Sequence, residues 1–462
     1  MYKNKPCGRQ LYDDQGMCIC HSKLENKDVS HFQNEIDNIF KDDTSDRLDF
    51  NRFFFPKKDW RFFRQTFHKD ANFKFAEFSG IVNFWNAEFS GKANFYRTRF
   101  IGKAPFYRTK FIGKVEFERT EFSTEAIFRR AQFSDKADFY LAEFSGKANF
   151  GRAEFSGKVN FLSTFFYEGI LLRNGIAKSG AHIIFDIDHL IYNYLWVKCV
   201  KRSENISRNE MWRVSADIRS FKIDKNAVVT FLKVSMEGVH LLESDISRME
   251  FIAVEWPKTN RWHKRRTLAD EVIENVRYEA IVDEIERKKK CSLIAQVYQG
   301  LQEIYINTYR YLEAGDFFVG EQEMRRKGKG KLGQYFSLNN AYRILSYYGQ
   351  SMLLPLFWLF GVISIVPGLL MYGEVRINLQ DKSDIVTYNW SFNISDLLFL
   401  KTDYWQTFLL NFSFMAFSRS KMHDALTEPW QLALVNIEAL VVIGLVAMSL
   451  LAVRRRFKRK NF

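Results

Sequence analysis

Residues 84–106 read FWNAEFSGKANFYRTRFIGKAPF and contain the pattern that decides the fold. Phenylalanines recur there in steps that alternate between five and six residues, and a small residue such as Ala87 or Ala93 stands two positions before each of them. Internal periodicity of this kind predicts a repeat architecture. The same alternation runs through a longer series: Phe67, Phe73, Phe78, Phe84, Phe89, Phe95, Phe100, Phe106, Phe111, Phe117, Phe122, Phe128, Phe133, Phe139, Phe144, Phe150, Phe155 and Phe161.

The spacing distinguishes strand from helix. An eleven-residue period is also compatible with a right-handed supercoil of helices. Residues two apart face opposite sides of a helix, however, whereas in a strand they share one face. Each small residue and its phenylalanine are therefore predicted to point inward from the same short strand. Coils stacked about 4.8 Å apart would then form continuous ladders of phenylalanine.

A second run has a period of five: Phe231, Met236, Leu241, Ile246, Phe251 and Trp256. Together the two runs resemble the pentapeptide-repeat family, over roughly residues 60–256. The resemblance implies a right-handed β-helix in which four five-residue sides make one coil. We expect this β-helix over residues 50–260, irregular at about 167–224, where the period fails. The predicted fold class is mainly β, with an α-helical membrane region.

Charge limits the functions of such a rod. The chain has a net charge of +14, and residues 57–170 hold 20 Lys/Arg and 13 Asp/Glu, a net of +7. Some soluble pentapeptide-repeat proteins inhibit gyrase by mimicking DNA, which requires an acidic surface. A nucleic-acid binder needs a clustered basic stripe with stacking aromatics. Here the aromatics are assigned to the core and lysines alternate with acids, so a solvated surface is favoured over nucleic-acid binding.

The N-terminal residues 1–45 are predicted to cap the rod. The first ten residues contain no apolar run that would mark a signal peptide, which places the module in a reducing cytosol. Cys7, Cys18, Cys20 and His21 are candidate zinc ligands. The adjacency of Cys20 and His21 hinders tetrahedral closure, and the alternative is a cap whose cysteines are buried apolar residues. An open β-helix end requires a cap in either case.

Residues 264–345 are predicted to be a helical linker. The pattern over 264–327 predicts helix with a break at Gly315, and the charges from Glu321 to Arg326 indicate a solvent-facing surface. This stretch is similar to the linker of membrane-bound bacterial pentapeptide-repeat proteins.

Residues 346–462 are predicted to be a membrane domain. Spans are expected at about 351–372 and 430–453, each long enough to cross a bilayer. The stretch between them, 373–429, has five Lys/Arg and seven Asp/Glu, whereas bases flank the spans outside it. The positive-inside rule therefore places both termini and the β-helix in the cytoplasm, at the inner membrane of a prokaryote. Glu438, near Asn436, is expected to face a helix partner or an aqueous cavity.

Between the spans, the amphipathic residues 404–417 are predicted to be a re-entrant helix. Two spans around such a helix resemble the pore layout of potassium channels, and the resemblance implies a filter rich in glycine. The matching residues 417–424 read FSRSKMHD. They contain no glycine, and Arg419 and Lys421 would repel cations. The layout is channel-like without the filter.

The sequence contains no set of residues typical of catalysis, and the chain is not expected to be an enzyme. The favoured function is a membrane-anchored scaffold or sensor that presents its β-helix to a cytoplasmic protein. The alternative is a non-selective or anion pore gated through the β-helix. A membrane-tethered gyrase or nucleic-acid binder is a third, disfavoured class. The expected partners are the membrane, a cytoplasmic protein and further copies of the chain.

Overall fold

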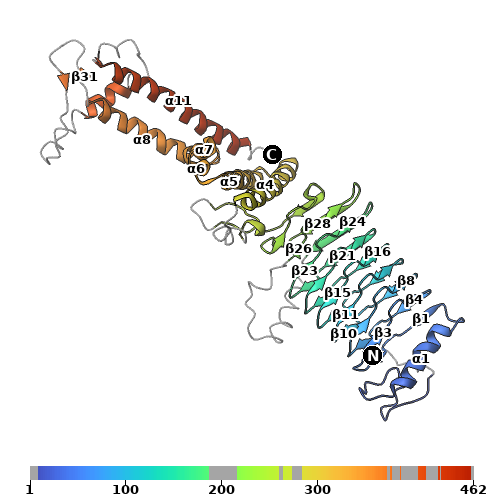
Figure 1. Ribbon diagram of the computed structural model, residues 1–462. Helices are drawn as coiled ribbons and strands as arrows, with labels where there is room; N and C mark the ends of the chain where they lie inside the picture. Colours follow the sequence, from blue (N-terminus) through green and yellow to red (C-terminus); the bar gives the residue numbers. More distant parts are fainter. Residues whose placement is uncertain are drawn as a thin grey trace. The chain divides into compact units, whose positions relative to one another are not determined.

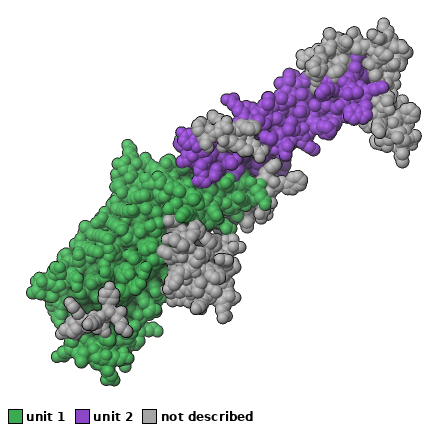
Figure 2. Space-filling view, turned by 180° about the vertical axis from the view of Figure 1, so that it is seen from behind, with its two compact units in different colours: residues 1–304 green, residues 305–462 purple. Residues whose placement is uncertain are grey.

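A computed structural model describes residues 9–186, 216–259, 264–272, 284–371 and 428–458, with the short pieces 375–376, 385–386, 404–412 and 425–426. The chain divides into two compact units, residues 1–304 and 305–462 (Figure 2). The first unit is a parallel β-solenoid of about 8 turns, and the second is helical (Figure 1).

The solenoid has four sides, which the chain visits in order. Side 1 contains β1 (Arg47–Asp49), β5 (Asp70–Asn72), β9 (Ala93–Asn94), β13 (Val115–Glu116), β17 (Ala137–Asp138), β21 (Lys158–Leu162), β25 (His182–Asp186), β28 (Val228–Leu232) and β30 (Met249–Ile252). Side 2 contains β2 (Phe54–Phe55), β6 (Glu77–Phe78), β10 (Arg99–Phe100), β14 (Glu121–Phe122), β18 (Glu143–Phe144) and β22 (Phe165–Phe166). Side 3 contains β3 (Trp60–Arg61), β7 (Val82–Asn83), β11 (Ala104–Pro105), β15 (Ala126–Ile127), β19 (Ala148–Asn149), β23 (Ile170–Leu171), β26 (Ala216–Asp217) and β29 (Val239–His240). Side 4 contains β4 (Thr66–Phe67), β8 (Glu88–Phe89), β12 (Lys110–Phe111), β16 (Gln132–Phe133), β20 (Glu154–Phe155), β24 (Ile176–Ala177) and β27 (Lys222–Ile223).

Between residues 70 and 177, successive coils are in register at a step of 22 residues. Phe100 pairs with Phe78 in the coil before it and with Phe122 in the coil after it. Their rings stack nearly parallel, with centroids 5.1 and 4.9 Å apart. Every phenylalanine of the first run is buried, as are Phe231, Met236, Leu241, Ile246 and Phe251 of the second. Stacked rings therefore fill the interior from coil to coil.

Threonine replaces alanine at some inward positions without leaving a hydroxyl unpaired. Thr98, Thr109 and Thr120 are fully buried. Each hydroxyl donates to a main-chain carbonyl of the preceding coil, as Thr98 does to Phe73 at 2.6 Å. A buried polar group is tolerated because it has this partner.

Two opposite corners of each coil are tight turns. At the corner between sides 3 and 4, the Ala87 amide donates to the Phe84 carbonyl and Asn86 has a φ of 54°. This is the left-handed residue that a type II turn requires. The corner between sides 2 and 3 instead uses close-packed glycines. A Cβ on Gly102 would lie 2.3 Å from the Gly80 carbonyl oxygen of the preceding coil.

The coil continues through residues 165–186, where the aromatic period predicted an irregular stretch. β22 to β25 take the same four sides as the strands before them. Between the buried Phe166 and Phe185, the buried apolar side chains are those of Ile170, Leu172, Ala177, Ala181 and Ile183. The phenylalanine period fails because other apolar residues occupy the inward positions, while the backbone path is kept. Residues 187–215 lie outside the described part of the chain.

Both ends of the solenoid are covered within the first unit. At the N-terminal end, α1 (Val29–Lys41) begins at Asp28, whose side chain accepts from the amides of Ser30 and His31. Phe32 of α1 is fully buried, with its ring centroid 5.0 Å from that of Trp60. At the other end, α4 (Glu284–Asn307) approaches the last coil closely. A Cβ on Gly300 would lie 3.7 Å from Ile246.

The second unit contains α5 (Tyr311–Lys327), α6 (Lys331–Tyr335), α7 (Leu338–Ser346), α8 (Leu353–Leu370) and α11 (Pro429–Lys458). The expected break at Gly315 is wrong, because Gly315 is buried inside α5. The chain breaks earlier, between α4 and α5, where Tyr309 has a φ of 59°. Glycine was the obvious breaker in the sequence, but a tyrosine takes the left-handed position.

Two helices of this unit are long and apolar enough to cross a membrane, α8 and residues 429–454 of α11, with mean hydropathies of 2.2 and 2.3. They pack against each other through a cluster that includes Val366, Leu370 and Val435. The Gln431 side-chain amide donates to the Leu370 carbonyl at 2.9 Å. Large apolar side chains elsewhere on both helices are exposed, including Phe357 and Leu440.

Candidate functional site

The predicted zinc ligands lie at the N-terminal cap of the solenoid. The thiol cluster comprises Cys18, Cys20 and His21, whereas Cys7 lies outside the described residues. Both thiols are buried, and the Cys18 sulfur lies 3.1 Å from Nδ1 of His21. His21 Nε2 is 3.1 Å from the Asn51 carbonyl oxygen. A histidine whose second nitrogen donates to a carbonyl is oriented as zinc-binding histidines are.

Hydrogen bonds within the thiol cluster shift the pKa values of His21 and Cys20. The hydrogen bond to Cys18 raises the pKa of His21, against the opposing effect of burial. A hydrogen bond to Cys18, followed by burial, raises the pKa of the Cys20 thiol. Within the described residues no group of three or more His, Cys, Asp or Glu side chains is arranged to hold a metal ion. The zinc site therefore stays a prediction that depends on a further ligand.

Nearby, Lys27 fastens the cap to the first coil. Its ammonium group donates to the carbonyls of Ile19, Ser22 and Phe54 at 2.7–2.8 Å. Burial lowers the pKa of Lys27 to about 8. The three acceptors use all three donors of an ammonium group, so we expect the charged form to persist at neutral pH.

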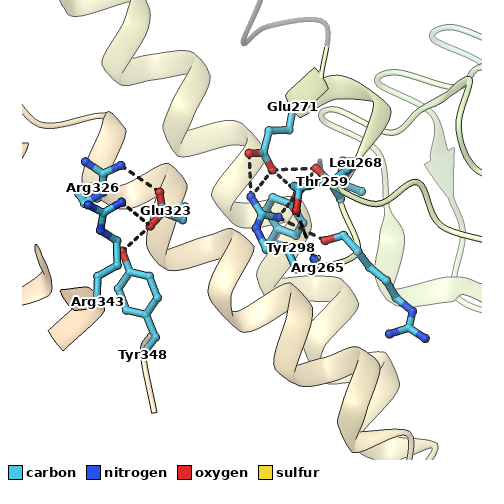
Figure 3. Close-up of polar contacts among 11 residues, drawn as sticks. Thr259, Arg265, Leu268, Glu271, Tyr298, Glu323, Arg326, Arg343 and Tyr348 are labelled. Carbon is cyan, nitrogen blue, oxygen red and sulfur yellow. Dashed lines mark hydrogen bonds and ion pairs between the residues drawn. The ribbon is translucent and has the colours of Figure 1, made fainter. Parts of the chain in front are cut away.

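A buried polar network, the cap cluster, joins α4 to the chain segment that follows the last coil (Figure 3). It comprises Arg265, Thr267, Glu271 and Tyr298. Arg265 binds both carboxylate oxygens of Glu271, at 2.7 and 2.8 Å. The Tyr298 hydroxyl donates to the same carboxylate and accepts from the Leu268 amide. Burial, and then the charge of Glu271, raises the pKa of Tyr298, so it remains a hydroxyl donor.

A second network, the linker cluster, lies in the helical unit (Figure 3). Glu323 of α5 accepts from Arg326 and from the Tyr348 hydroxyl, each at 2.9 Å. Arg343 of α7 approaches the same carboxylate at 3.9 Å. The expectation of a solvent-facing charged surface is wrong here, because Glu321, Glu323 and Arg326 are buried. Helical spacing accounts for the pairs Glu321–Arg325 and Glu323–Arg326, but it does not reveal the tertiary contacts of Tyr348 and Arg343 with Glu323.

Glu438 and Asn436, the polar pair predicted to lie within the second span, have different surroundings. Glu438 of α11 is only 2% exposed, whereas Asn436 is exposed. The Glu438 carboxylate accepts from the side-chain amide of Asn411, at 3.0 and 3.2 Å. Asn411 belongs to residues 404–412, which are helical, and it is 1% exposed. Arg419 and Lys421, the predicted pore-loop residues, lie outside the described residues.

The corner between sides 3 and 4 carries a column of side chains that the sequence analysis did not single out. Six arginines occupy it in five of six consecutive coils, and we name them the arginine ridge: Arg64, Arg108, Arg129, Arg130, Arg152 and Arg173. All are exposed or half-buried. Among the described residues, none of the six forms a salt bridge.

Aromatic side chains extend the ridge at its N-terminal end. Phe63, Trp85 and Tyr107 occupy the same corner, and their rings meet edge to face with centroids 5.3 and 5.7 Å apart. The Arg64 and Arg108 guanidinium groups lie over Phe63 and Tyr107, at 4.9 and 5.4 Å. These aromatics lie on the surface, whereas the sequence analysis assigned the aromatic residues of the repeat to the core.

Acidic residues are distributed unevenly around the solenoid. The outward strand positions of side 3 from β7 to β23 are uncharged: Asn83, Pro105, Ile127, Asn149 and Leu171. On the opposite side 1, the corresponding positions include Asp49, Glu116 and Asp138. Hydrogen bonds to Lys114 and Lys92 lower the pKa of Glu116 in spite of burial. Acidic charge therefore gathers on side 1. Arginines without a salt bridge among the described residues are more numerous at the corner of sides 3 and 4, which has six, than at the opposite corner, which has Arg52 and Arg97.

The repeat can now be compared with known proteins. A family model for pentapeptide repeats, nine copies long, matches residues 62–110 and 95–142. This match falls on the four-sided coils described above. This chain is a pentapeptide-repeat β-helix protein. No curated protein and no solved structure matches it.

The pentapeptide-repeat fold is a structural repeat, and the solenoid fits a non-catalytic protein. Its inward side chains are apolar or are threonines bonded to the backbone, so chemistry can only be performed at its surface or ends. The cap and linker clusters pair each charge with an opposite charge or a hydroxyl. Both clusters of this pentapeptide-repeat protein therefore join elements together, although the Nε atoms of Arg326 and Arg343 in the linker cluster have no hydrogen-bond partner among the described residues.

The arginine ridge could have been found in the sequence with the right step. The steps of five and six in the phenylalanine series follow one coil around its four sides. A step of 22 instead follows one position from coil to coil. At that step Arg64, Arg108, Arg130 and Arg152, each two positions after a buried phenylalanine, line up in one column of this pentapeptide-repeat protein, with Asn86 at the same position of the second coil.

Proposed function

We propose that the protein is a non-catalytic scaffold, anchored in a membrane, that presents its β-helix to a cytoplasmic protein. The observation that carries this proposal is the continuous solenoid of about 8 turns, whose interior is filled by stacked phenylalanines. A rod of this kind offers long flat sides of fixed spacing to a partner, as other repeat proteins do.

The anchor rests on α8 and α11. Each contains an apolar stretch with exposed large side chains, which in water would form an extended apolar surface. A bilayer removes that cost, since about 20 apolar residues span its core. The bases at the C-terminal end of α11, which include Arg454 to Arg456, agree with a cytoplasmic C-terminus.

The alternative, a pore gated through the β-helix, is less well supported. An ion pathway lined by Glu438 would expose its carboxylate to water. The carboxylate is instead buried against Asn411 of the same chain. Glu438 therefore supports a role in holding the helices together.

The anchor is tested by washing membranes that contain the full chain at alkaline pH. The chain should stay in the pellet and be released by detergent alone; release by alkali would contradict the anchor. The side of the membrane is tested with a cysteine that replaces Asn378, between the spans. A membrane-impermeant thiol reagent should label it from outside, while a tag after Phe462 should need permeabilised cells for detection.

The scaffold role is tested by site-specific photocrosslinking in cells. A photoactivatable residue at Glu121, on the outer face of side 2, should give one reproducible crosslinked protein. The same residue at Lys158, the exposed first residue of β21 on side 1, is the control and should not crosslink to that protein. A crosslink from neither position, with the chain present in the membrane, would contradict a partner bound along the coil.

A further inference from the structure

The arginine ridge is built on an unfavourable backbone conformation. Arg64, Arg108, Arg130 and Arg152 have φ between 55° and 59°, in the left-handed region. This conformation is unfavourable for residues with a Cβ, and asparagine and glycine adopt it most readily. The fold accepts asparagine there, since Asn86 has the same conformation in an intervening coil. Arginine also takes this conformation at the opposite corner, as Arg52, Arg97 and Arg119, so the left-handed turn alone does not distinguish the ridge, and its charge and surroundings must do so.

The ridge arginines also form no salt bridge with a carboxylate among the described residues. Arg99 on side 2 shows the contrast, because it pairs with Glu77 and Glu121 of the neighbouring coils. No ridge arginine has such a carboxylate among the described residues, and adjoining side 3 has no acidic outward residue from β7 to β23. The uncompensated guanidinium groups thus adjoin a strip whose outward residues include Pro105, Ile127 and Leu171. This surface suits a partner that is anionic and partly apolar.

The shape of the ridge narrows the class of partner. It is a corner of the solenoid and therefore convex, so it cannot enclose a small anion. A single-stranded nucleic acid would stack its bases on exposed ring faces. The guanidinium groups of Arg64 and Arg108 already lie over Phe63 and Tyr107, and Trp85 is wedged edge-on between these rings. These contacts disfavour base stacking and leave the arginines free for phosphate.

We propose that the arginine ridge and side 3 bind the surface of an anionic phospholipid bilayer. Guanidinium groups bind phosphate oxygens in pairs. Tryptophan and tyrosine favour the headgroup region, where Trp85 and Tyr107 would lie. From the coil of Arg64 to that of Arg173 there are five coil steps, which make a strip about 24 Å long. The acidic side 1 then faces away from the lipid.

This inference rests on the proposed anchor in one respect. Membrane spans in the same chain would keep the solenoid at a high effective concentration near the lipid, so weak contacts suffice. Each arginine close to an anionic leaflet strengthens the attraction to it by roughly fivefold. Six such residues along one straight edge favour a bound state that high salt should reverse.

The test is arginine footprinting of the full chain in lipid nanodiscs. Phenylglyoxal labelling is measured by mass spectrometry in discs of phosphatidylcholine alone and in discs with about a third phosphatidylglycerol. Arg108, Arg130 and Arg152 should be labelled about fivefold more slowly in the anionic discs, and 0.5 M salt, roughly, should abolish the difference. Arg97 is the matched control, since it is exposed and left-handed at the opposite corner. Its rate should not change.

A variant that combines Arg108→Asn, Arg130→Asn and Arg152→Asn tests whether the ridge arginines cause the protection in anionic discs. Asparagine suits the left-handed turns, so the fold is kept while three charges are lost. The remaining ridge residues, Arg129 and Arg173, should lose their protection. The variant Arg97→Asn should leave them protected.

Three results would overturn the proposal. The first is equal labelling of the ridge in neutral and anionic discs. The second is equal protection of Arg97. The third is protection by a single-stranded oligonucleotide in neutral discs, which would assign the ridge to nucleic acid. Failure of the anchor is a separate observation, because a chain released by alkali can still be footprinted on anionic vesicles.

Discussion

Replacing Phe111 with alanine tests the interior of the solenoid at its most regular part. Phe111 is 1% exposed and stacks between Phe89 and Phe133, with both centroid distances at 5.1 Å. It also meets Phe117 edge to face at 5.9 Å. Truncating a buried phenylalanine costs about 3–5 kcal/mol through lost burial and the cavity left behind. Stacked rings on both sides favour the upper half of that range, about 4–5 kcal/mol.

The loss of stability in Phe111→Ala should be confined to the coils around residue 111, because each coil is supported only by its neighbours. Hydrogen exchange of the full chain is the appropriate assay. The amides of Lys110 and Gln132, which donate to the carbonyls of Ala87 and Thr109, report on the coils around the cavity. They should exchange about a thousandfold faster, the factor that corresponds to about 4 kcal/mol. Amides beyond Ile170 should change much less.

Phe75→Ala provides the matched control, since it removes the same ring from an outer corner. Phe75 is 40% exposed and contacts Tyr96 edge to face at 5.5 Å. Its loss should cost about 1 kcal/mol or less. If Phe111→Ala leaves exchange unchanged, or if Phe75→Ala has the larger effect, the assignment of these rings to inside and outside is wrong.

Three further predictions concern the stacking of coils, the ends of the rod and the membrane. Gly102→Ala should prevent regular stacking and expose its coil to proteolysis, because its Cβ would lie 2.3 Å from the Gly80 carbonyl oxygen; Gly300→Ala, whose Cβ would meet Ile246 in ordinary contact at 3.7 Å, should leave proteolysis unchanged. The thiol cluster should bind up to one zinc per chain, and elemental analysis that finds no transition metal in protein purified without chelators would end this prediction. The chain should not conduct K⁺ selectively, because residues 417–424 contain no glycine for a carbonyl filter. Planar-bilayer recording of K⁺-over-Na⁺ selectivity would contradict this, and anion current would favour the pore.

A fifth prediction concerns the cap cluster. Tyr298→Phe removes a hydroxyl that bonds the Glu271 carboxylate and the Leu268 amide. Leaving these buried groups short of a partner should cost about 1–3 kcal/mol. This loss of stability should be measurable as a lower unfolding temperature of residues 1–304. The control Tyr309→Phe, at an exposed tyrosine, should leave that temperature unchanged.

The solenoid was predictable because its determinants are local and repeated. An inward phenylalanine and its small partner, two residues apart, recur often enough that register and burial follow from spacing alone. The coils that contain Ile170 and Leu172 were not predicted, although their backbone follows the same path. The prediction depended on the spacing of phenylalanines, and other apolar residues take the inward positions there. The apolar lengths of α8 and α11 were likewise visible in the sequence, because hydropathy over about 20 residues needs no tertiary information.

The polar networks were not predictable for the opposite reason. Glu271 and Tyr298 are 27 positions apart, and Asn411 and Glu438 are equally distant. No local period relates such residues, so only the folded chain shows that each carboxylate has a partner. The charges of α5 were wrongly predicted to face solvent for the same reason. Helical spacing places Glu323 near Arg326, but it does not show that Tyr348 covers the pair.

The helix α1 has a consequence for how molecules of this protein meet one another. The first coil would otherwise end in unpaired main-chain donors and acceptors, spaced as in cross-β fibrils. Phe32 and Phe40 of α1 instead lie over the aromatic residues of that coil, including Phe55 and Phe67. The helix thus occupies the position that a second molecule's coil would take. Loss of α1 would therefore expose the end of the first coil and favour end-to-end polymerisation.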